Sequence, residues 1–457
     1  MTNVLTTEGA YLSRFSGRFH DLQQTPNDTA LNPWLKDLQK AAITRFQQLG
    51  IPKRNDEEWR FTSVSEIATN RYSWPSVTHA VHPQTVVEVA ALATRWFADG
   101  LESFGAVILN GQPLVADVLE GLTQQFGGAT IHLLTAQGSD GEIDSLASYS
   151  PFLGQLASFD QSAFTALNTA LFENCVVIQI PRNAVIERPI ELLFVGASDS
   201  ASSPTFVSPR ILILAGENSQ ATIVETYVGL DGSNYTNNVV SEVFVERSAV
   251  IDHYKITDES AAATHVATME IQLEGSSNFS SHNITLGGAL VRNDVNAKLN
   301  GEHIECTLNG LYLGNGDRVI DNHTAIDHAK PNCNSHEVYK GILTDRSRGV
   351  FNGKIFVRLD AQKTDAKQTN KTLLLSPDAR IDTKPQLEIL ADDVKCTHGA
   401  TVGQLDPNQV FYLRSRGLSE SEARNLLTYA FAGDIVQRIK LEDLRAELDA
   451  RLHSMLP

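Results

Sequence analysis

The chain has 457 residues, of which 42% are hydrophobic and 20% are charged, with 54 acidic against 37 basic side chains. This composition is typical of a folded globular protein, and the formal charge of −17 argues against a nucleic-acid or anionic-membrane ligand. No apolar run approaches the roughly 18 residues of a membrane span, and residues 1–8 lack the basic start and apolar core of a signal peptide. We therefore expect a cytoplasmic protein that binds neither nucleic acid nor a membrane.

The first predicted element is an amphipathic helix over residues 30–50. Asn32 is suited to cap this helix, Pro33 fits its first turn, and Gly50 ends it. Apolar residues recur inside it at spacings of three and four, which places them on one face. That face predicts packing against a core.

A mixed pattern follows the N-terminal helical region. Helical periodicity occurs over residues 87–97 and 162–172. Strand-like runs occur over residues 106–109 and 176–180. This part of the chain is therefore predicted to combine helices and strands.

From residue 205 to residue 406 the pattern changes to short β-type runs separated by turn residues. Almost no helical pattern interrupts this region. Both a β-sandwich and a β-solenoid, whose coils stack without long crossovers, would produce such a succession. No strict sequence period distinguishes the two. The clearest runs cover residues 210–214, 221–225, 239–245, 279–286, 350–359 and 371–375.

Helical signals return after Asp406. Ser419 and Glu422 form a capping box, and an apolar stripe continues from there to Gly433. Leucines at every third or fourth position then predict a last amphipathic helix. Helical ends protect the open edges of a β-stack and can present a docking surface. The predicted regions are a helical region 1–75, a mixed α/β region 76–204, a β-core 205–406 and a helical domain 407–457.

Cys396 and His398 lie two residues apart at the end of the β-region. In a strand, residues i and i+2 point to the same face, so this thiol and imidazole would lie side by side. The pair suits iron, zinc or an iron–sulfur cluster, but two ligands cannot hold such a metal alone. The alternative is that both fill the end of the core, since cysteine is often buried. The other cysteines, Cys175, Cys306 and Cys333, form no CxxC pair and are expected to be free thiols.

A second group of metal-competent side chains is His323, Asp327, His328, Cys333 and His336. The odd separation of His323 and His328 places them on opposite faces of a continuous strand. Their spacing matches no standard zinc pattern, which needs four converging ligands. We interpret this group as polar rungs and turns of the β-core.

Six longer stretches carry a more specific pattern. They are residues 50–62, 166–172, 339–355, 361–376, 385–406 and 411–417. Together they resemble the SufB/SufD family of iron–sulfur cluster assembly proteins. The Asp-Asp-Val-Lys-Cys-Thr-His-Gly-Ala-Thr form of residues 392–401 is similar to the SufD branch rather than to SufB.

The resemblance implies a right-handed parallel β-helix core flanked by helical domains. It also implies a heterodimer with SufB, carried on two copies of the SufC ATPase and supplied by a sulfur donor system. The cofactor would be a transient iron–sulfur cluster shared with SufB, and whether a flavin assists stays open. The family's interface residues map onto Cys396 and His398. Our hypothesis is that His398 supplies an imidazole ligand and Cys396 a neighbouring ligand or sulfur relay.

Phe411, Tyr412, Arg414 and Arg416 place two aromatic rings beside two cations. One interpretation is an ordinary amphipathic helix that packs on the core. Aromatic and arginine side chains are also the usual anchors of protein interfaces. The resemblance maps SufC docking onto the helical segment near Pro407, which favours the second interpretation.

The sequence contains no P-loop, no dinucleotide-binding fingerprint and no Gly-x-Ser-x-Gly elbow. We therefore predict a non-catalytic scaffold subunit, with ATP hydrolysis left to the partner. One alternative is a secreted-type β-solenoid polysaccharide lyase or glycosidase, although the chain lacks a signal peptide and has only 7% aromatic residues. Another is a metal-free structural adaptor for an ATPase. The enzyme alternative would use carboxylates among Asp360, Asp365, Asp392 and Asp393.

Overall fold

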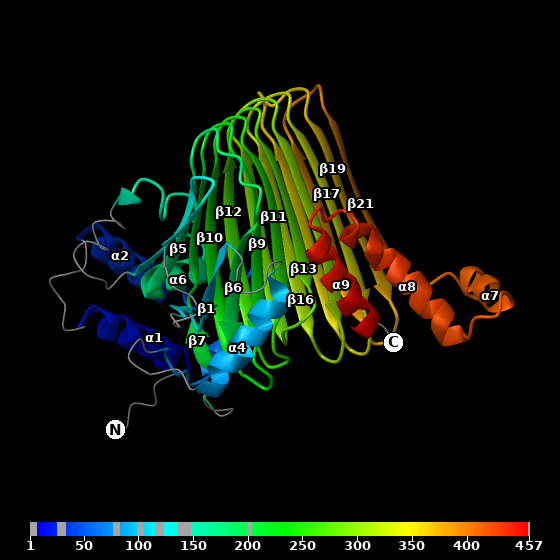
Figure 1. Ribbon diagram of the computed structural model, residues 1–457, viewed down its shortest axis with the longest axis horizontal. Helices are drawn as coiled ribbons and strands as arrows, with labels where there is room; N and C mark the ends of the chain where they lie inside the picture. Colours follow the sequence, from blue (N-terminus) through cyan, green and yellow to red (C-terminus); the bar gives the residue numbers. More distant parts are fainter. Residues whose placement is uncertain are drawn as a thin grey trace.

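A computed structural model describes residues 7–24, 33–75, 83–97, 104–114, 123–135, 148–198 and 203–455. Its centre is a β-solenoid formed by two facing sheets, with helices from both ends of the chain around it (Figure 1). This architecture confirms the predicted mainly β fold with helical flanks and decides against a sandwich. The predicted cap Asn32 lies outside the described residues.

The chain alternates between the two sheets, so most strands pair in parallel with the strand two places later. Parallel pairing begins at β5 and at β1, before residue 205. In spatial order, sheet A contains β3 (Thr123–Phe126), β4 (Ala129–Thr135), β5 (Asn174–Ile180), β8 (Arg210–Ala215), β10 (Tyr235–Val245), β12 (Thr264–Leu273), β14 (Leu290–Leu299), β16 (Val319–His328), β18 (Arg348–Val357) and β20 (Arg380–Ile389), with β7 (Thr205–Val207) beside β10. Sheet B contains β2 (Gln112–Pro113), β1 (Gly105–Leu109), β6 (Ile190–Gly196), β9 (Gln220–Gly229), β11 (Val250–Asp258), β13 (Asn278–Thr285), β15 (Glu305–Gly314), β17 (Asn334–Leu343), β19 (Asp365–Leu374) and β21 (Lys395–Gly403).

The solenoid interior is built from straight rows of side chains. Because the register is in phase, Phe279, Cys306 and Ser335 follow one another as a buried row through β13, β15 and β17. Glycine makes room where an aromatic ring crosses the interior. A Cβ atom at Gly310 would lie 2.2 Å from Cε1 of the buried Tyr339 ring, so a larger residue there would collide with it.

Turns at one edge of the solenoid repeat a left-handed residue in successive coils. Their backbone amides donate to carbonyl groups of the following turn, as Asn218 N–H does to Arg247 at 3.0 Å. The residue types vary although the conformation is conserved along the stack, so the repeat is invisible as a sequence motif. The residues are Asn218, Ser248, Ser276, His303, Asn332 and Lys363, which follow one another at intervals of 27 to 31 residues.

Helices cover the outer faces of both sheets. On sheet A these are α1 (Thr7–Gln23), α2 (Pro33–Leu49), α3 (Ser65–Thr69), α6 (Ala163–Leu171) and the short 3-10 turn η1 (Glu57–Trp59). On sheet B these are α4 (Pro83–Trp96), α8 (Glu420–Val436) and α9 (Glu442–Met455), while α7 (Pro407–Ser415) projects beyond the sheets (Figure 1). The capping box of Ser419 and Glu422 is present. Helix α8 continues past Gly433 to Val436, because Ile435 and Val436 are buried against sheet B.

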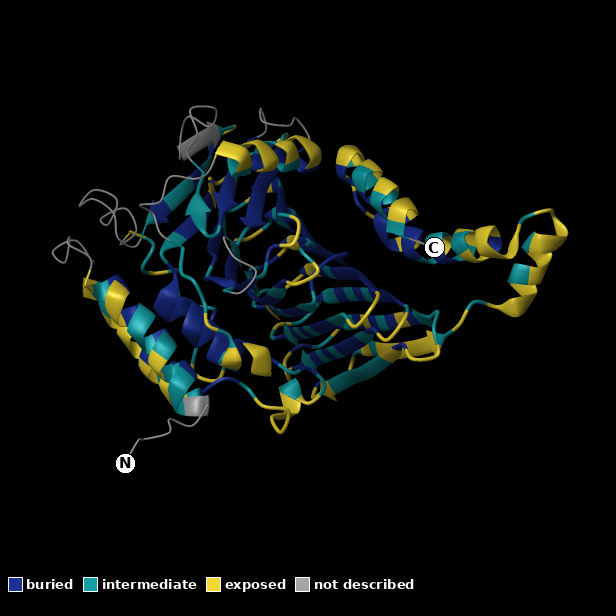
Figure 2. Cartoon of the chain, turned by 90° about the horizontal axis from the view of Figure 1, so that it is seen from below, coloured by how far each residue is buried: buried dark blue, intermediate teal, exposed yellow. Residues whose placement is uncertain are grey.

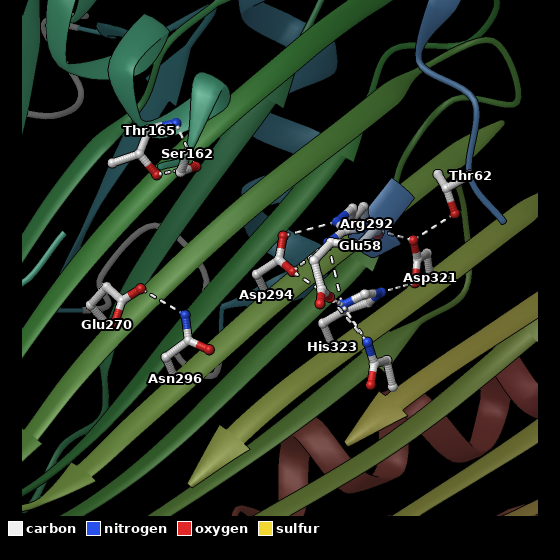
Figure 3. A network of polar contacts seen from close by, with 11 residues as sticks. Glu58, Thr62, Ser162, Thr165, Glu270, Arg292, Asp294, Asn296, Asp321 and His323 are labelled. Atoms are coloured by element: carbon white, nitrogen blue, oxygen red, sulfur yellow. Dashed lines mark hydrogen bonds and ion pairs between the residues drawn. The ribbon is translucent and has the colours of Figure 1, made fainter. Parts of the chain in front are cut away.

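An ion-pair network joins the segment after α2 to the outer face of sheet A (Figure 3). His323 of β16 lies 3.2 Å from Glu58 of η1 and 3.0 Å from Asp321. Arg292 pairs with Asp321 at 2.9 Å, and its guanidinium lies 3.9 Å from the centre of the Trp59 ring. Burial acts to lower the pKa of His323, but Asp321 and Glu58 outweigh it and raise that pKa to about 9.

We predict that His323 stabilises the fold in a pH-dependent manner. A folded-state pKa of about 9, above the ordinary value of 6.5, makes the contribution complete below pH 6.5 and lost as the pH rises through 9. At neutral pH, His323→Gln should lower the free energy of unfolding by on the order of 3 kcal/mol. Thermal unfolding of both proteins across this range should show the difference shrinking at alkaline pH. The exposed His303→Gln should show no such shrinking difference from the wild type, and a pH-independent difference for His323→Gln would contradict the prediction.

Candidate functional site

The last coil of the solenoid is open. β20 and β21 end their sheets, and no strand in the described part of the chain pairs with their outer edges. In Figure 2 the last strands are coloured intermediate to exposed, whereas the strands before them carry more buried residues. The free backbone N–H and C=O groups of two terminal strands form a template for further pairing.

Cys396 and His398 both lie on β21, in this last coil. Cys396 is in register with Ala366 of β19 and His398 with Gln368. Ala366 and Gln368 are buried in the solenoid interior, so Cys396 and His398 continue two interior rows. The structure therefore brings the two predicted site residues to one face, which is the inward face of the open end.

Their surroundings differ. Cys396 is partly buried and packs beside a small apolar cluster that includes Ile355, Val357 and Ala366. Burial raises the pKa of its thiol, so the thiolate forms less readily than in a free cysteine. His398 is exposed. Cys396 therefore partly fills the end of the core, whereas His398 does not.

Two polar residues that sequence reasoning missed lie in the interior row behind His398. Gln368 is buried, and its amide nitrogen donates to Glu337 of β17 at 2.7 Å. Burial raises the pKa of Glu337 to about 7, against the hydrogen bond from Gln368. Because side chains alternate along a strand, the sequence can place Glu337 and Gln368 each on one face of its own strand. Only the register between the strands shows that they lie in the same interior row as His398.

The described residues contain no group of three or more His, Cys, Asp or Glu side chains arranged to hold a metal ion. A metal ion bound by Cys396 and His398 would therefore need further ligands from outside the described residues. The second sequence group does not converge: His323 and His328 lie on opposite faces of β16, as interpreted from their spacing. Cys333 is buried in a turn, where its thiol donates to the Gly301 carbonyl at 3.1 Å.

Helix α7 carries the other predicted site residues. Asp406 caps it, Pro407 starts it, and none of its residues is buried. Phe411 is 71% exposed and Tyr412 is 56% exposed. Arg416 lies over the Tyr412 ring, and Arg414 faces Glu420 at 3.5 Å. The helix projects from the sheets and is exposed along its length (Figure 2), so packing of this helix on the core is ruled out.

None of the described helices has the length and hydrophobicity needed to span a membrane.

The geometry defines a class: a β-solenoid protein with helices on both outer faces and an open last coil. Comparison with protein families then gives the particular group. The model described as "SUF system FeS cluster assembly, SufBD core domain" matches residues 195–431, and that of the SufBD protein N-terminal region matches residues 141–192. The chain therefore belongs to the SufBD family of iron–sulfur cluster assembly proteins, which confirms the resemblance found in the sequence.

Individual relatives support the same family assignment. The chain is 33% identical to an iron–sulfur cluster assembly SufBD family protein of Synechocystis sp., over 91% of this chain and 89% of that protein. It is 30% identical to the iron–sulfur cluster assembly protein SufD of Escherichia coli, over 91% of this chain and 92% of that protein. SufD of Bacillus subtilis is 25% identical over 97% of both chains. The family places this protein in iron–sulfur cluster assembly.

We predict that Cys396 is the thiol most accessible to alkylation in the folded protein. Cys175, Cys306 and Cys333 are buried, and burial raises the pKa of Cys175 and Cys306 to about 12. Timed iodoacetamide labelling at mildly alkaline pH, followed by peptide mass spectrometry, should show Cys396 modified first. Cys396→Ser should remove the fast phase. Equal labelling of Cys333 and Cys396 would refute the prediction.

Proposed function

We propose that this chain is a non-catalytic scaffold subunit that pairs with SufB through its last coil and docks the SufC ATPase through α7. The observation that carries the proposal is the last coil, where β20 and β21 have outer edges that no strand in the described part of the chain pairs with, and where β21 carries the exposed His398. A partner with the same two-sheet cross-section would continue both sheets at once. Strand addition of this kind gives affinity through backbone hydrogen bonds.

Exposed apolar side chains support this use of the open end. Soluble proteins seldom gather such side chains without a partner, and these lie on the last two coils rather than being scattered. Their burial would add hydrophobic stabilisation to the backbone pairing. They are Leu359, Ile389, Leu390 and Val402, which are 63%, 39%, 55% and 46% exposed.

The nascent cluster would be assembled as cargo at the interface between the two subunits. His398 would supply an imidazole ligand, and SufB would supply the ligands that this chain lacks. Cys396 would act as a neighbouring ligand, or its thiolate would attack the outer sulfur of a persulfide on the donor system, forming a Cys396 persulfide and releasing the donor thiol. Because burial raises its pKa, Cys396 would need a cation or metal nearby to become a thiolate.

Docking of SufC at α7 would connect ATP hydrolysis to the solenoid. Helix α8 follows α7 and is anchored on sheet B, where Lys340 of β17 pairs with Asp434 at 2.9 Å and donates to the Phe431 carbonyl at 2.9 Å. A displacement of α7 would therefore reach β17, two strands away from β21 in sheet B, through α8. Association of two SufC subunits would in this way shift the paired solenoids.

His398→Ala should leave the complex with SufB and SufC intact but remove most of its iron and sulfide. The reason is the loss of a ligand at a site whose remaining ligands come from the partner. Anaerobic co-purification followed by iron and sulfide analysis measures this.

Thr397→Ala is the matched control for His398→Ala, because Thr397 points outward on the same strand and should leave the cluster content unchanged. Full cluster content in an assembled His398→Ala complex would contradict the proposed ligand role. It would then favour the metal-free adaptor.

Tyr412→Ala combined with Arg416→Ala should weaken SufC binding and leave the β-core folded. Truncating two interface anchors raises the Kd by roughly 10- to 100-fold, as calorimetric titration would show. The control is Arg182→Ala with Val185→Ala, which removes an exposed cation and an exposed apolar side chain far from α7 in the sequence. Unchanged affinity in the Tyr412 and Arg416 variant would place SufC elsewhere.

A further inference from the structure

A cavity of about 490 Å³ lies between residues 54–61 and the outer face of β16, β18 and β20. Figure 3 shows part of its wall, where Glu58 of η1 meets His323 of β16. The cavity is on the outside of sheet A, so it is separate from the inward-facing Cys396 and His398. It is also the place where the Asp-Glu-Glu-Trp-Arg-Phe-Thr stretch of residues 56–62 meets the solenoid.

The carboxylates in the cavity wall already have cationic partners. Each is within ion-pair distance of a lysine, arginine or histidine, so none is left to attract a cation. The pairs are Glu57 with Lys384, Glu58 with His323, Asp321 with Arg292, and Asp382 with Arg348.

Two arginines in the same wall are uncommitted. Arg54 and Arg60 line the cavity, are exposed, and form no ion pair with any residue in the described part of the chain. Arg60 lies over the Phe61 ring at 5.6 Å, and Arg348 lies over the same ring at 5.4 Å, which orients this part of the wall. In a chain with a formal charge of −17, this cavity therefore presents unpaired positive charge.

Asn352 holds Glu58 in place in the cavity wall. The side-chain nitrogen of Asn352 donates to Glu58 at 3.1 Å. Glu58 is therefore held by both Asn352 and His323, which leaves the two arginines as the anion-binding groups of this wall.

We propose that this cavity binds a small organic anion, with its carboxylate or phosphate groups on Arg54 and Arg60. Guanidinium groups bind both kinds of anion through paired hydrogen bonds. The volume lies within the range of small-molecule sites. The proposal rests on residues that take no part in the proposed scaffold function, so either can fail without the other.

The test is calorimetric titration of the full chain at constant ionic strength with citrate, tricarballylate, glycerol 3-phosphate and inorganic phosphate. Citrate and glycerol 3-phosphate together distinguish a carboxylate ligand from a phosphate ligand. We expect saturable binding of at least one of the organic anions, and a loss of about tenfold or more in Arg54→Gln with Arg60→Gln.

Lys298→Gln with Lys330→Gln is the matched control, because it removes the same charge from exposed lysines outside the cavity. It should bind as the wild type does, whereas equal losses in both double variants would mean non-specific charge attraction. Unchanged thermal unfolding of the unliganded arginine variant would show that it is folded. Absence of saturable binding up to about 20 mM of every anion would overturn the proposal, since mass action still reports weak sites there. Equal binding by the arginine variant and the wild type would overturn it as well.

Discussion

The in-phase parallel pairing of strands two places apart is the constraint on which the rest of this structure depends. It carries each side-chain position unchanged along a sheet, so that a residue in one coil lies directly beside its counterpart in the next. The interior rows, the stacked turns and the flat outer faces that receive helices all follow from it. At the end of the stack the same pairing leaves the outer edges of the last coil free, because no further strand among the described residues follows it.

Charged contacts hold the two ends of the chain to the outer faces of the stack. The segment after α2 is held by His323 and its carboxylate partners on sheet A. The C-terminal helices are held on sheet B by ion pairs such as Lys340 with Asp434 and Lys440 with Asp252. Helix α7 lacks any such anchor to the sheets among the described residues and none of its side chains is buried. The projecting helix α7 is therefore followed directly in the sequence by the firmly held helices α8 and α9.

The proposed scaffold and the proposed anion site use opposite sides of the same strands. On β20 and β21 the inward face and the free edges lead to His398, whereas the outward face of β20 carries Lys384 and Asp382 beside the cavity. Alternation of side chains in a strand makes both uses compatible, since neighbouring residues point to opposite faces. A partner at the open end would lie beside the cavity without filling it.

Local sequence patterns were sufficient for several of the elements. The helix ending at Gly50, the capping box at Ser419 and the strand pair Cys396 and His398 were all predicted from spacing or capping, because these signals involve residues a few positions apart. Helix α1 and the extension of α8 past Gly433 were not predicted, since packing against distant strands decides them. The family was evident from the sequence, because its pattern is distributed over most of the chain.

By itself the sequence determined the β-rich core, its helical flanks and the shared face of Cys396 and His398. Only the tertiary structure decided that this face is the inner one at an open end, that Gln368 and Glu337 lie behind His398, and that Glu58 meets His323. The physical reason is distance along the chain. A strand's alternation is a two-residue property, whereas pairing register joins residues about thirty positions apart, through turns that share a conformation but no sequence.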